Sequence, residues 1–187
     1  MFAKFFSYFI PINVHKKNSA ISNTLEVTWN NGELVLDSKN TNYSYGSLQR
    51  ILRKGLKYIG FERIKKFENI LILGVAGGSV IKTIVDEIKF KGKITGVEID
   101  AQVVEIANKY FKLNEIKNLE LVVDDAFEFV LKTKEKYDLI VIDVFQDTKM
   151  PNFLFEDFFI NHVNSLLKVN GFILFNTMVI YEKDRIR

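Results

Sequence analysis

The stretch that decides the fold is N-I-L-I-L-G-V-A-G-G-S, residues 69–79. An apolar run suited to a buried strand leads into a turn of glycine and small side chains, and the turn opens a predicted helix. Glycine has no Cβ and accepts positive φ, so the backbone of such a turn can approach a bound group closely. The free N–H groups at the start of the helix favour a nucleotide at the same place.

A second strand is predicted at residues 93–97, about 20 residues beyond the turn, and it is followed by Glu98 and Asp100. In a nucleotide-binding β-α-β unit, an acidic residue at this position holds the two ribose hydroxyls. The pair of motifs therefore predicts a bound cofactor of the adenosine type.

From residue 69 onward, predicted strands alternate with helices that each carry one apolar stripe. The run L-I-V-I at residues 139–142 is apolar throughout, as in strands covered by helices on both faces. This alternation predicts an α/β fold with a doubly wound parallel sheet, Rossmann-like, with right-handed crossovers. The expected strands are 69–73, 93–98, 119–123, 138–143 and 171–176.

The N-terminal part has a different pattern. Residues 24–35 predict a β-hairpin with its turn at Asn30-Asn31-Gly32, and residues 37–44 are expected to form a polar loop. We therefore divide the chain into residues 1–45, a hairpin region with a gate loop, and residues 46–187, the cofactor-binding domain. Either the chain is truncated after the fifth strand or the further strands usual in this fold are missing.

Composition narrows the function. The 187 residues include 26 basic and 23 acidic side chains, and this small, scattered excess does not indicate nucleic-acid binding. The absence of cysteine excludes disulfides and thiolate metal sites and fits the cytoplasm. The two isolated histidines predict no metal site, and the apolar segment 1–11 is too short to span a membrane. We expect that segment to pack on the domain or on a dimer partner.

The turn also indicates which nucleotide binds. A dinucleotide fingerprint has glycine at its first, third and sixth positions, whereas this turn has Gly74, Ala76 and Ser79 there. Asp125 follows the third strand, where a carboxylate can accept a hydrogen bond from the adenine amine. S-adenosylmethionine is therefore favoured over NAD. Each carboxylate at these strand ends could instead cap the following helix, Asp100 and Asp124 above all.

The chain resembles spermidine synthase and its relatives with the class I methyltransferase fold. The resemblance rests on L-V-L-D at 34–37, the glycine turn, V-E-I-D at 97–100, D-A-F-E-F at 125–129, Y-D-L-I-V-I-D at 137–143 and the segment 154–171. It implies that Glu98 binds the ribose and that Asp125 with Ala126 binds adenine. It also implies a homodimer formed through the hairpin region, and that the following residues surround the sulfonium: Gly74, Val75, Ala76, Gly77 and Gly78.

Two departures from the family bear on the reaction. The family has Asp, which anchors the amine of the transferred aminopropyl group, where this chain has Gly77. The family also has D-S-S-D-P after the fourth strand, whereas here the run is D-V-F-Q-D at 143–147. Burying a dicationic amine without paired carboxylates is costly, so these changes weigh against aminopropyl transfer.

The resulting hypothesis is an enzyme that transfers a methyl group from S-adenosylmethionine to a small acceptor without a metal. Asp143 is the candidate general base, although it could instead cap the following turn. Asn42 and Tyr45, in the loop expected to cover the cleft, are candidate substrate-binding residues, although the tyrosine could simply pack. The alternatives are aminopropyl transfer from decarboxylated S-adenosylmethionine, and a non-catalytic relative that binds the adenosyl group.

Overall fold

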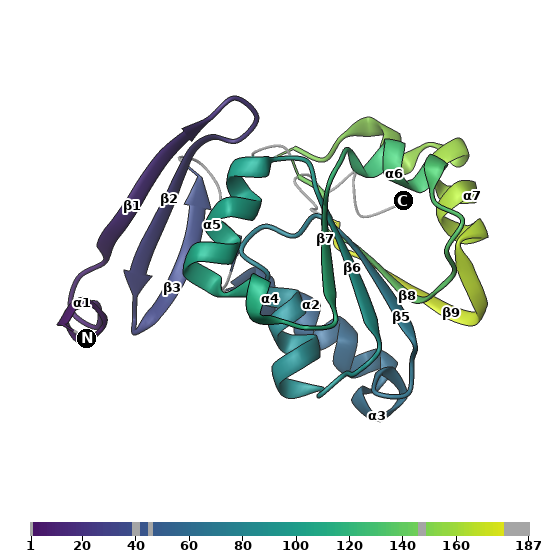
Figure 1. The fold of residues 1–187 in the computed structure, drawn as a ribbon, viewed down its shortest axis with the longest axis horizontal. Coiled ribbons are helices and arrows are strands. Elements are labelled where there is room, and N and C mark those ends of the chain that lie inside the picture. Colours follow the sequence, from purple (N-terminus) through teal and green to yellow (C-terminus); the bar gives the residue numbers. More distant parts are fainter. Residues whose placement is uncertain (1, 39–41, 45–46, 146–148, 178–187) are drawn as a thin grey trace, which may run out of the picture.

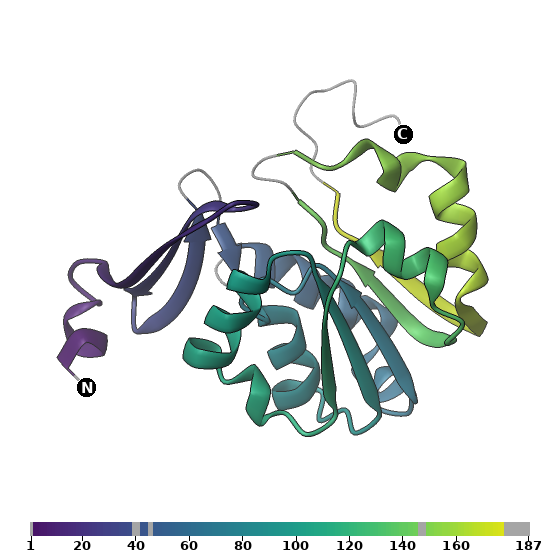
Figure 2. The same ribbon diagram turned by 45° about the horizontal axis from the view of Figure 1, so that its top comes forward.

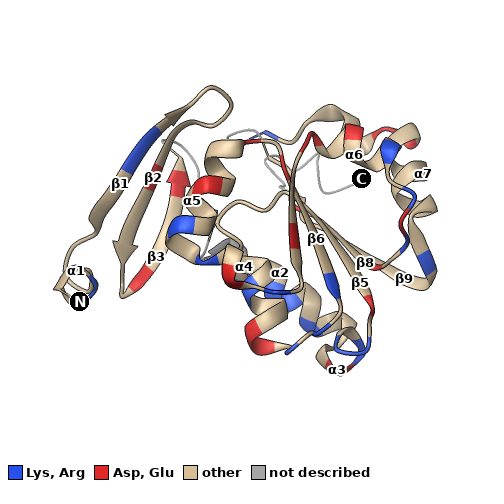
Figure 3. Cartoon of the chain, viewed as in Figure 1, with Lys and Arg blue, Asp and Glu red and all other residues tan. Residues whose placement is uncertain are grey.

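The computed structural model describes residues 2–38, 42–44, 47–145 and 149–177. Its strands form a five-stranded and a four-stranded sheet, and helix α5 (Ala101–Phe111) lies between the two (Figures 1 and 2). Basic residues on β1 and α2 are interspersed with acidic ones on neighbouring elements (Figure 3). Among the described residues, no helix has the length and apolar character needed to cross a membrane.

The larger sheet is parallel throughout, with strand order β7-β6-β5-β8-β9. Its strands are β5 (Asn69–Leu73), β6 (Lys93–Glu98), β7 (Leu119–Val123), β8 (Tyr137–Ile142) and β9 (Leu167–Phe175). The predicted doubly wound α/β fold is thereby confirmed. The largest boundary error is at β9, which begins at Leu167 rather than at residue 171, because its irregular pairing with β8 starts earlier; β8 and the end of β9 differ from the prediction by one residue.

Helices cover both faces of this sheet. Ile70 and Ile72 of β5 belong to a core shared with α2 (Ser47–Ile59) and with the helix after the glycine turn. The alternate residues Leu71 and Leu73 face a second core built with the helices α6 (Ala126–Lys132) and α7 (Asp157–Ser165). The helix after the turn starts as α4 (Ser79–Lys82) and continues as a π-helix over Thr83–Glu87. Shorter segments are α3 (Phe61–Ile64) and the 3₁₀ turns Leu113–Glu115 and Asn152–Phe155.

The smaller sheet is antiparallel, with the order β1-β2-β3-β4. Strands β2 (Asn23–Asn30) and β3 (Glu33–Ser38) form the predicted hairpin, and positive φ at Asn31 (48°) and Gly32 (79°) suits a two-residue turn. Strand β1 (Ile12–Ser19) was not predicted, because its side chains are mostly polar and backbone pairing with β2 holds it. The prediction of a polar loop at 37–44 was wrong at both ends of that range. Strand β3 continues to Ser38, and residues Asn42–Ser44 form strand β4, which pairs with β3.

Helix α5 packs against the smaller sheet through a core of its own. Leu25, Val27 and Leu36 of the sheet meet Val103 and Ile106 of the helix, all fully buried or nearly so. The N-terminal helix α1 (Phe2–Phe6) lies at the outer end of this sheet (Figure 1). Ser7, just after it, accepts hydrogen bonds from the N–H groups of the hairpin turn, while aromatic side chains of the segment remain exposed.

Candidate functional site

The carboxyl ends of the parallel strands meet at one edge of the sheet and bring together residues that are distant in the sequence. At this edge the N–H of Gly74 donates to Val97 O at 2.9 Å, and the N–H of Asp143 donates to Leu73 O at 2.8 Å. The N–H of Asp124 donates to Glu98 O at 3.2 Å. Ligands bind at this edge in open α/β sheets. The structure thus places the glycine turn, Glu98 and Asp143 around one region.

Glu98 is buried and holds the glycine turn directly. Its Oε2 accepts hydrogen bonds from the N–H groups of Val75 (3.1 Å) and Ala76 (3.0 Å), and its Oε1 accepts one from Asp100 (3.2 Å). Burial raises the pKa of Glu98, and the three N–H donors act in the opposite direction. An ionised carboxylate offers about four acceptor positions, so one remains for a ribose hydroxyl. The ribose-binding role of Glu98 fits this geometry and stays a prediction.

The turn itself depends on backbone conformations that favour glycine. Gly74 (φ 87°), Ala76 (φ 48°) and Gly78 (φ 78°) all lie in the left-handed region. A Cβ at Gly74 would stand 2.2 Å from the carbonyl oxygen of Asp143, so the turn and the end of β8 touch through backbone alone. The side chain of Ala76 costs about 1 kcal/mol in this conformation. This backbone strain thus lies in the turn that we expect to contact the sulfonium.

Asp143 lies directly after β8, and its side chain pairs with that of Asn176. The amide Nδ2 of Asn176 donates to Asp143 Oδ1 at 2.8 Å. Burial raises the pKa of Asp143 to about 6; the Asn176 hydrogen bond lowers it, and the nearby charge of Glu98 raises it. A carboxylate of this pKa can take up a proton near neutral pH. The geometry is therefore compatible with the predicted general base.

Two of the other carboxylates at this edge cap helices. Asp100 Oδ1 accepts from the N–H of Gln102 at 2.9 Å and begins α5, and Asp125 Oδ1 accepts from the N–H of Phe127 at 2.7 Å and begins α6. Asp124 caps no helix; its Oδ1 accepts the N–H of Asp125. Ala126 is buried in the first turn of α6. A role of Asp125 and Ala126 in binding adenine stays a prediction.

Sequence reasoning missed Asn176, which is buried at the end of β9 and whose N–H donates to Ile142 O at 2.9 Å. The sequence did contain a signal for this residue, because the polar side chain of Asn176 directly follows the apolar run F-I-L-F at 172–175. Of the two predicted substrate-binding residues, Asn42 lies in β4, paired with Asp37. Tyr45 lies outside the described residues.

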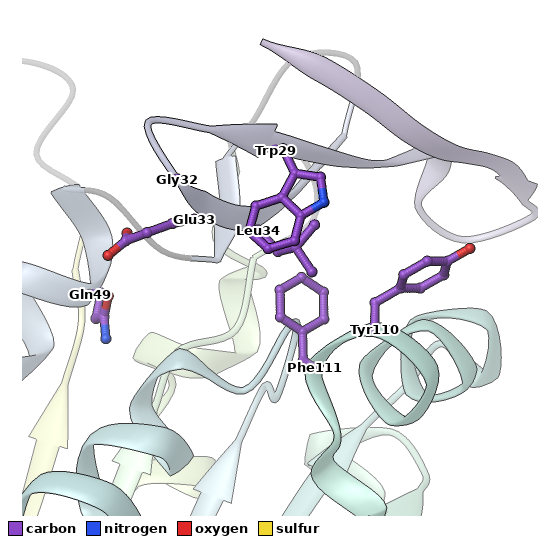
Figure 4. A pocket seen from close by; sticks show the side chains of 7 residues that line it. All are labelled: Trp29, Gly32, Glu33, Leu34, Gln49, Tyr110 and Phe111. Carbon is purple, nitrogen blue, oxygen red and sulfur yellow. The ribbon is translucent and has the colours of Figure 1, made fainter. Parts of the chain in front are cut away.

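A cavity of about 310 Å³ lies away from this edge, between the hairpin of the smaller sheet and the end of α5 (Figure 4). It is lined by Trp29, Gly32, Glu33, Leu34, Gln49, Tyr110 and Phe111. Figure 4 shows Trp29 and Leu34 of the sheet facing Phe111 of the helix. Trp29 is the only tryptophan of the chain, so its fluorescence reports on this junction.

Comparisons with known proteins agree with this architecture. Residues 49–186 match the family model described as the spermine/spermidine synthase domain. The chain is similar to the polyamine aminopropyltransferase of Prochlorococcus marinus strain MIT 9215, with 35% identity over 116 residues, which cover 58% of this chain and 40% of that protein. It spans less than half the length of such curated relatives.

Solved structures show the same fold. The spermidine synthase of Thermotoga maritima superposes with a TM-score of 0.73 at 20% identity, covering 92% of this chain and 60% of that one. Human methyltransferase-like protein 13, solved in complex with SAH, gives a TM-score of 0.60 at 22% identity and covers 69% of this chain and 64% of that one. The fold is thus shared by aminopropyl- and methyltransferases.

Proposed function

The chain belongs to the spermine/spermidine synthase domain family, and on that premise we propose that it binds the adenosyl donor of a polyamine aminopropyltransferase reaction. The observation that carries the proposal is the half-buried Asp143 carboxyl, with its pKa of about 6, on a residue whose backbone carbonyl contacts the glycine turn at Gly74. The methyl transfer favoured from the sequence is not supported by the relatives, whose names favour the aminopropyl alternative.

The residues at the sheet edge suit such a transfer. A sulfonium donor supplies an electrophilic carbon and leaves as a neutral thioether. Glu98 has an acceptor position for a ribose hydroxyl, and the turn from Gly74 to Gly78 lets the backbone lie close to the donor. Asp143 takes the proton that the acceptor amine releases while its nitrogen–carbon bond forms and the sulfur–carbon bond breaks.

Gly77 is the feature that this proposal must accommodate. The family carries an Asp at this position to hold the donor amine, and here no side chain is available at residue 77. We therefore expect a smaller preference for the decarboxylated donor than a full carboxylate set would give. The acceptor is a small amine, and the homodimer and the cytoplasmic location stay predictions.

Calorimetry with both donors tests the proposal. We expect the protein to bind decarboxylated S-adenosylmethionine more tightly than S-adenosylmethionine and to transfer its aminopropyl group to a diamine.

Asp143→Asn should keep donor affinity and lose turnover by about 100-fold or more, as expected for a general base. The matched control Asp124→Asn removes a carboxylate at the same edge and should leave turnover unchanged.

Each opposite outcome has a definite meaning. Tighter binding of S-adenosylmethionine together with a methylated product would restore the methyltransferase hypothesis. Donor binding without turnover on any amine would favour the non-catalytic alternative, and Asp143→Asn would then be silent.

A further inference from the structure

We propose that the β1–β2 turn of the smaller sheet is a positioning element of the donor site, and that Ser19 and Ser22 act through Asp100. The proposal rests on the proposed function and adds a second part of the chain to it. Ser19 Oγ and Ser22 Oγ both donate to Asp100 Oδ2, at 2.5 and 2.6 Å. Each contact joins residues at least 78 positions apart in the sequence, a serine of the smaller sheet and Asp100 after the larger sheet's strand β6.

A continuous set of hydrogen bonds runs from these serines to the glycine turn. The other oxygen of Asp100, Oδ1, accepts from the N–H of Gln102 and caps α5. The N–H of Asp100 donates to Glu98 Oε1, and Glu98 Oε2 in turn accepts from the turn at Val75 and Ala76. The carboxylate that would hold the ribose is thus fixed on both sides, by the glycine turn and by Asp100.

The serine turn is well suited to hold Asp100 still. Ser19 Oγ, besides donating to Asp100, accepts the N–H groups of Ile21 and Ser22, so the turn orients its own hydroxyl. Ser22 and Asp100 are both almost completely buried. Without the two hydroxyl donors, Asp100 Oδ2 would be a buried anionic oxygen lacking these partners, which is unfavourable. The backbone at Asp100, whose N–H donates to Glu98, would then lose its tie to the smaller sheet and hold Glu98 less firmly.

The test compares two ways of loosening the same junction. The double variant Ser19→Ala/Ser22→Ala removes both donors to Asp100. The control Lys17→Gln breaks the ion pair between Lys17 and Glu105 (2.7 Å), which also joins β1 to α5 but does not involve Asp100. Ser22→Thr keeps a hydroxyl and serves as the conservative variant.

Two readouts follow. Amide hydrogen exchange at Val75 and Ala76 reports the grip of Glu98 on the turn without any ligand, and calorimetry reports affinity for the decarboxylated donor. In the double variant we expect both amides to exchange faster and donor affinity to fall by about tenfold, the loss typical of one hydrogen bond to a charged group. Lys17→Gln should change neither quantity by more than about twofold, since exposed ion pairs contribute little. Ser22→Thr should retain parental behaviour.

Trp29 fluorescence shows whether the junction itself has opened. Unchanged emission in the double variant, together with faster exchange at Val75 and Ala76, supports the proposal. Unchanged exchange at these amides in the double variant overturns the proposal. The proposal is also overturned if both the double variant and Lys17→Gln show a shift in Trp29 emission and faster exchange at Val75 and Ala76. If the parent protein binds no adenosyl donor, the proposed function fails, and amide exchange still decides whether the serines control the turn.

Discussion

At the level of single residues, Asp143 gives the protein its clearest pH dependence. Burial raises the pKa of this carboxyl from 3.8 to about 6, so between these values the native state holds a proton that the unfolded chain releases. The resulting stabilisation is fully present below about pH 3.8 and is lost as the pH rises through about 6.

The variant Asp143→Asn should therefore match the parent near pH 4 and exceed it in free energy of unfolding near pH 7, by at most about 3 kcal/mol. Asn176→Ala should instead lower the free energy of unfolding near pH 7 relative to the parent. Losing the hydrogen-bond donor to Asp143 raises the pKa of that carboxyl further, so the loss of stability extends to higher pH. Urea unfolding at several pH values measures both. A parental pH dependence that persists in Asp143→Asn would contradict the assignment.

Among the structural elements, the glycine turn leaves little room for a side chain. A methyl group at Gly74 would meet the carbonyl oxygen of Asp143, whereas at Gly60, also at positive φ (105°), the nearest atom stands 3.9 Å away. A side chain would therefore strain the backbone at both glycines, but only at Gly74 would it also meet backbone atoms closely.

We expect Gly74→Ala to lower the free energy of unfolding by at least about 2 kcal/mol more than Gly60→Ala does, because the backbone of β8 has to move. Urea denaturation of the two variants gives the comparison. Equal losses would mean that the close contact with Asp143 does not limit the turn.

For the whole molecule, the junction between the two sheets depends on the small core around α5. Ile106 is almost completely buried there against the smaller sheet, whereas Ile84 is completely buried in the core of the larger sheet. Replacing either by alanine should cost about 2–5 kcal/mol. The difference should lie in which part of the molecule loosens.

In Ile106→Ala, Trp29 emission should shift to longer wavelength at lower urea than the loss of helical circular dichroism, because the smaller sheet separates first. In Ile84→Ala the two signals should change together. Coincident transitions in both variants would show that the two sheets unfold as one cooperative unit.

The strands of the larger sheet and the glycine turn could be predicted because their signals are local. Each strand is an apolar run with a glycine or polar residue near its end, and parallel strands necessarily bring those ends to one edge. The N-cap at Asp100 was likewise an open alternative, since a carboxylate before a helix is a local signal. Strands β1 and β4 gave no such signal, because backbone pairing with a neighbour holds them rather than an apolar pattern.

Local patterning was thus enough to define the α/β fold, the carboxyl edge of its parallel sheet, and the carboxylates Glu98 and Asp143 on that edge. The partners of those carboxylates were decided only in three dimensions. Asn176 reaches Asp143 because β9 lies beside β8, and Ser19 and Ser22 reach Asp100 because the smaller sheet packs on α5. Contacts between residues so far apart depend on strand order and helix packing, which no single stretch of residues encodes.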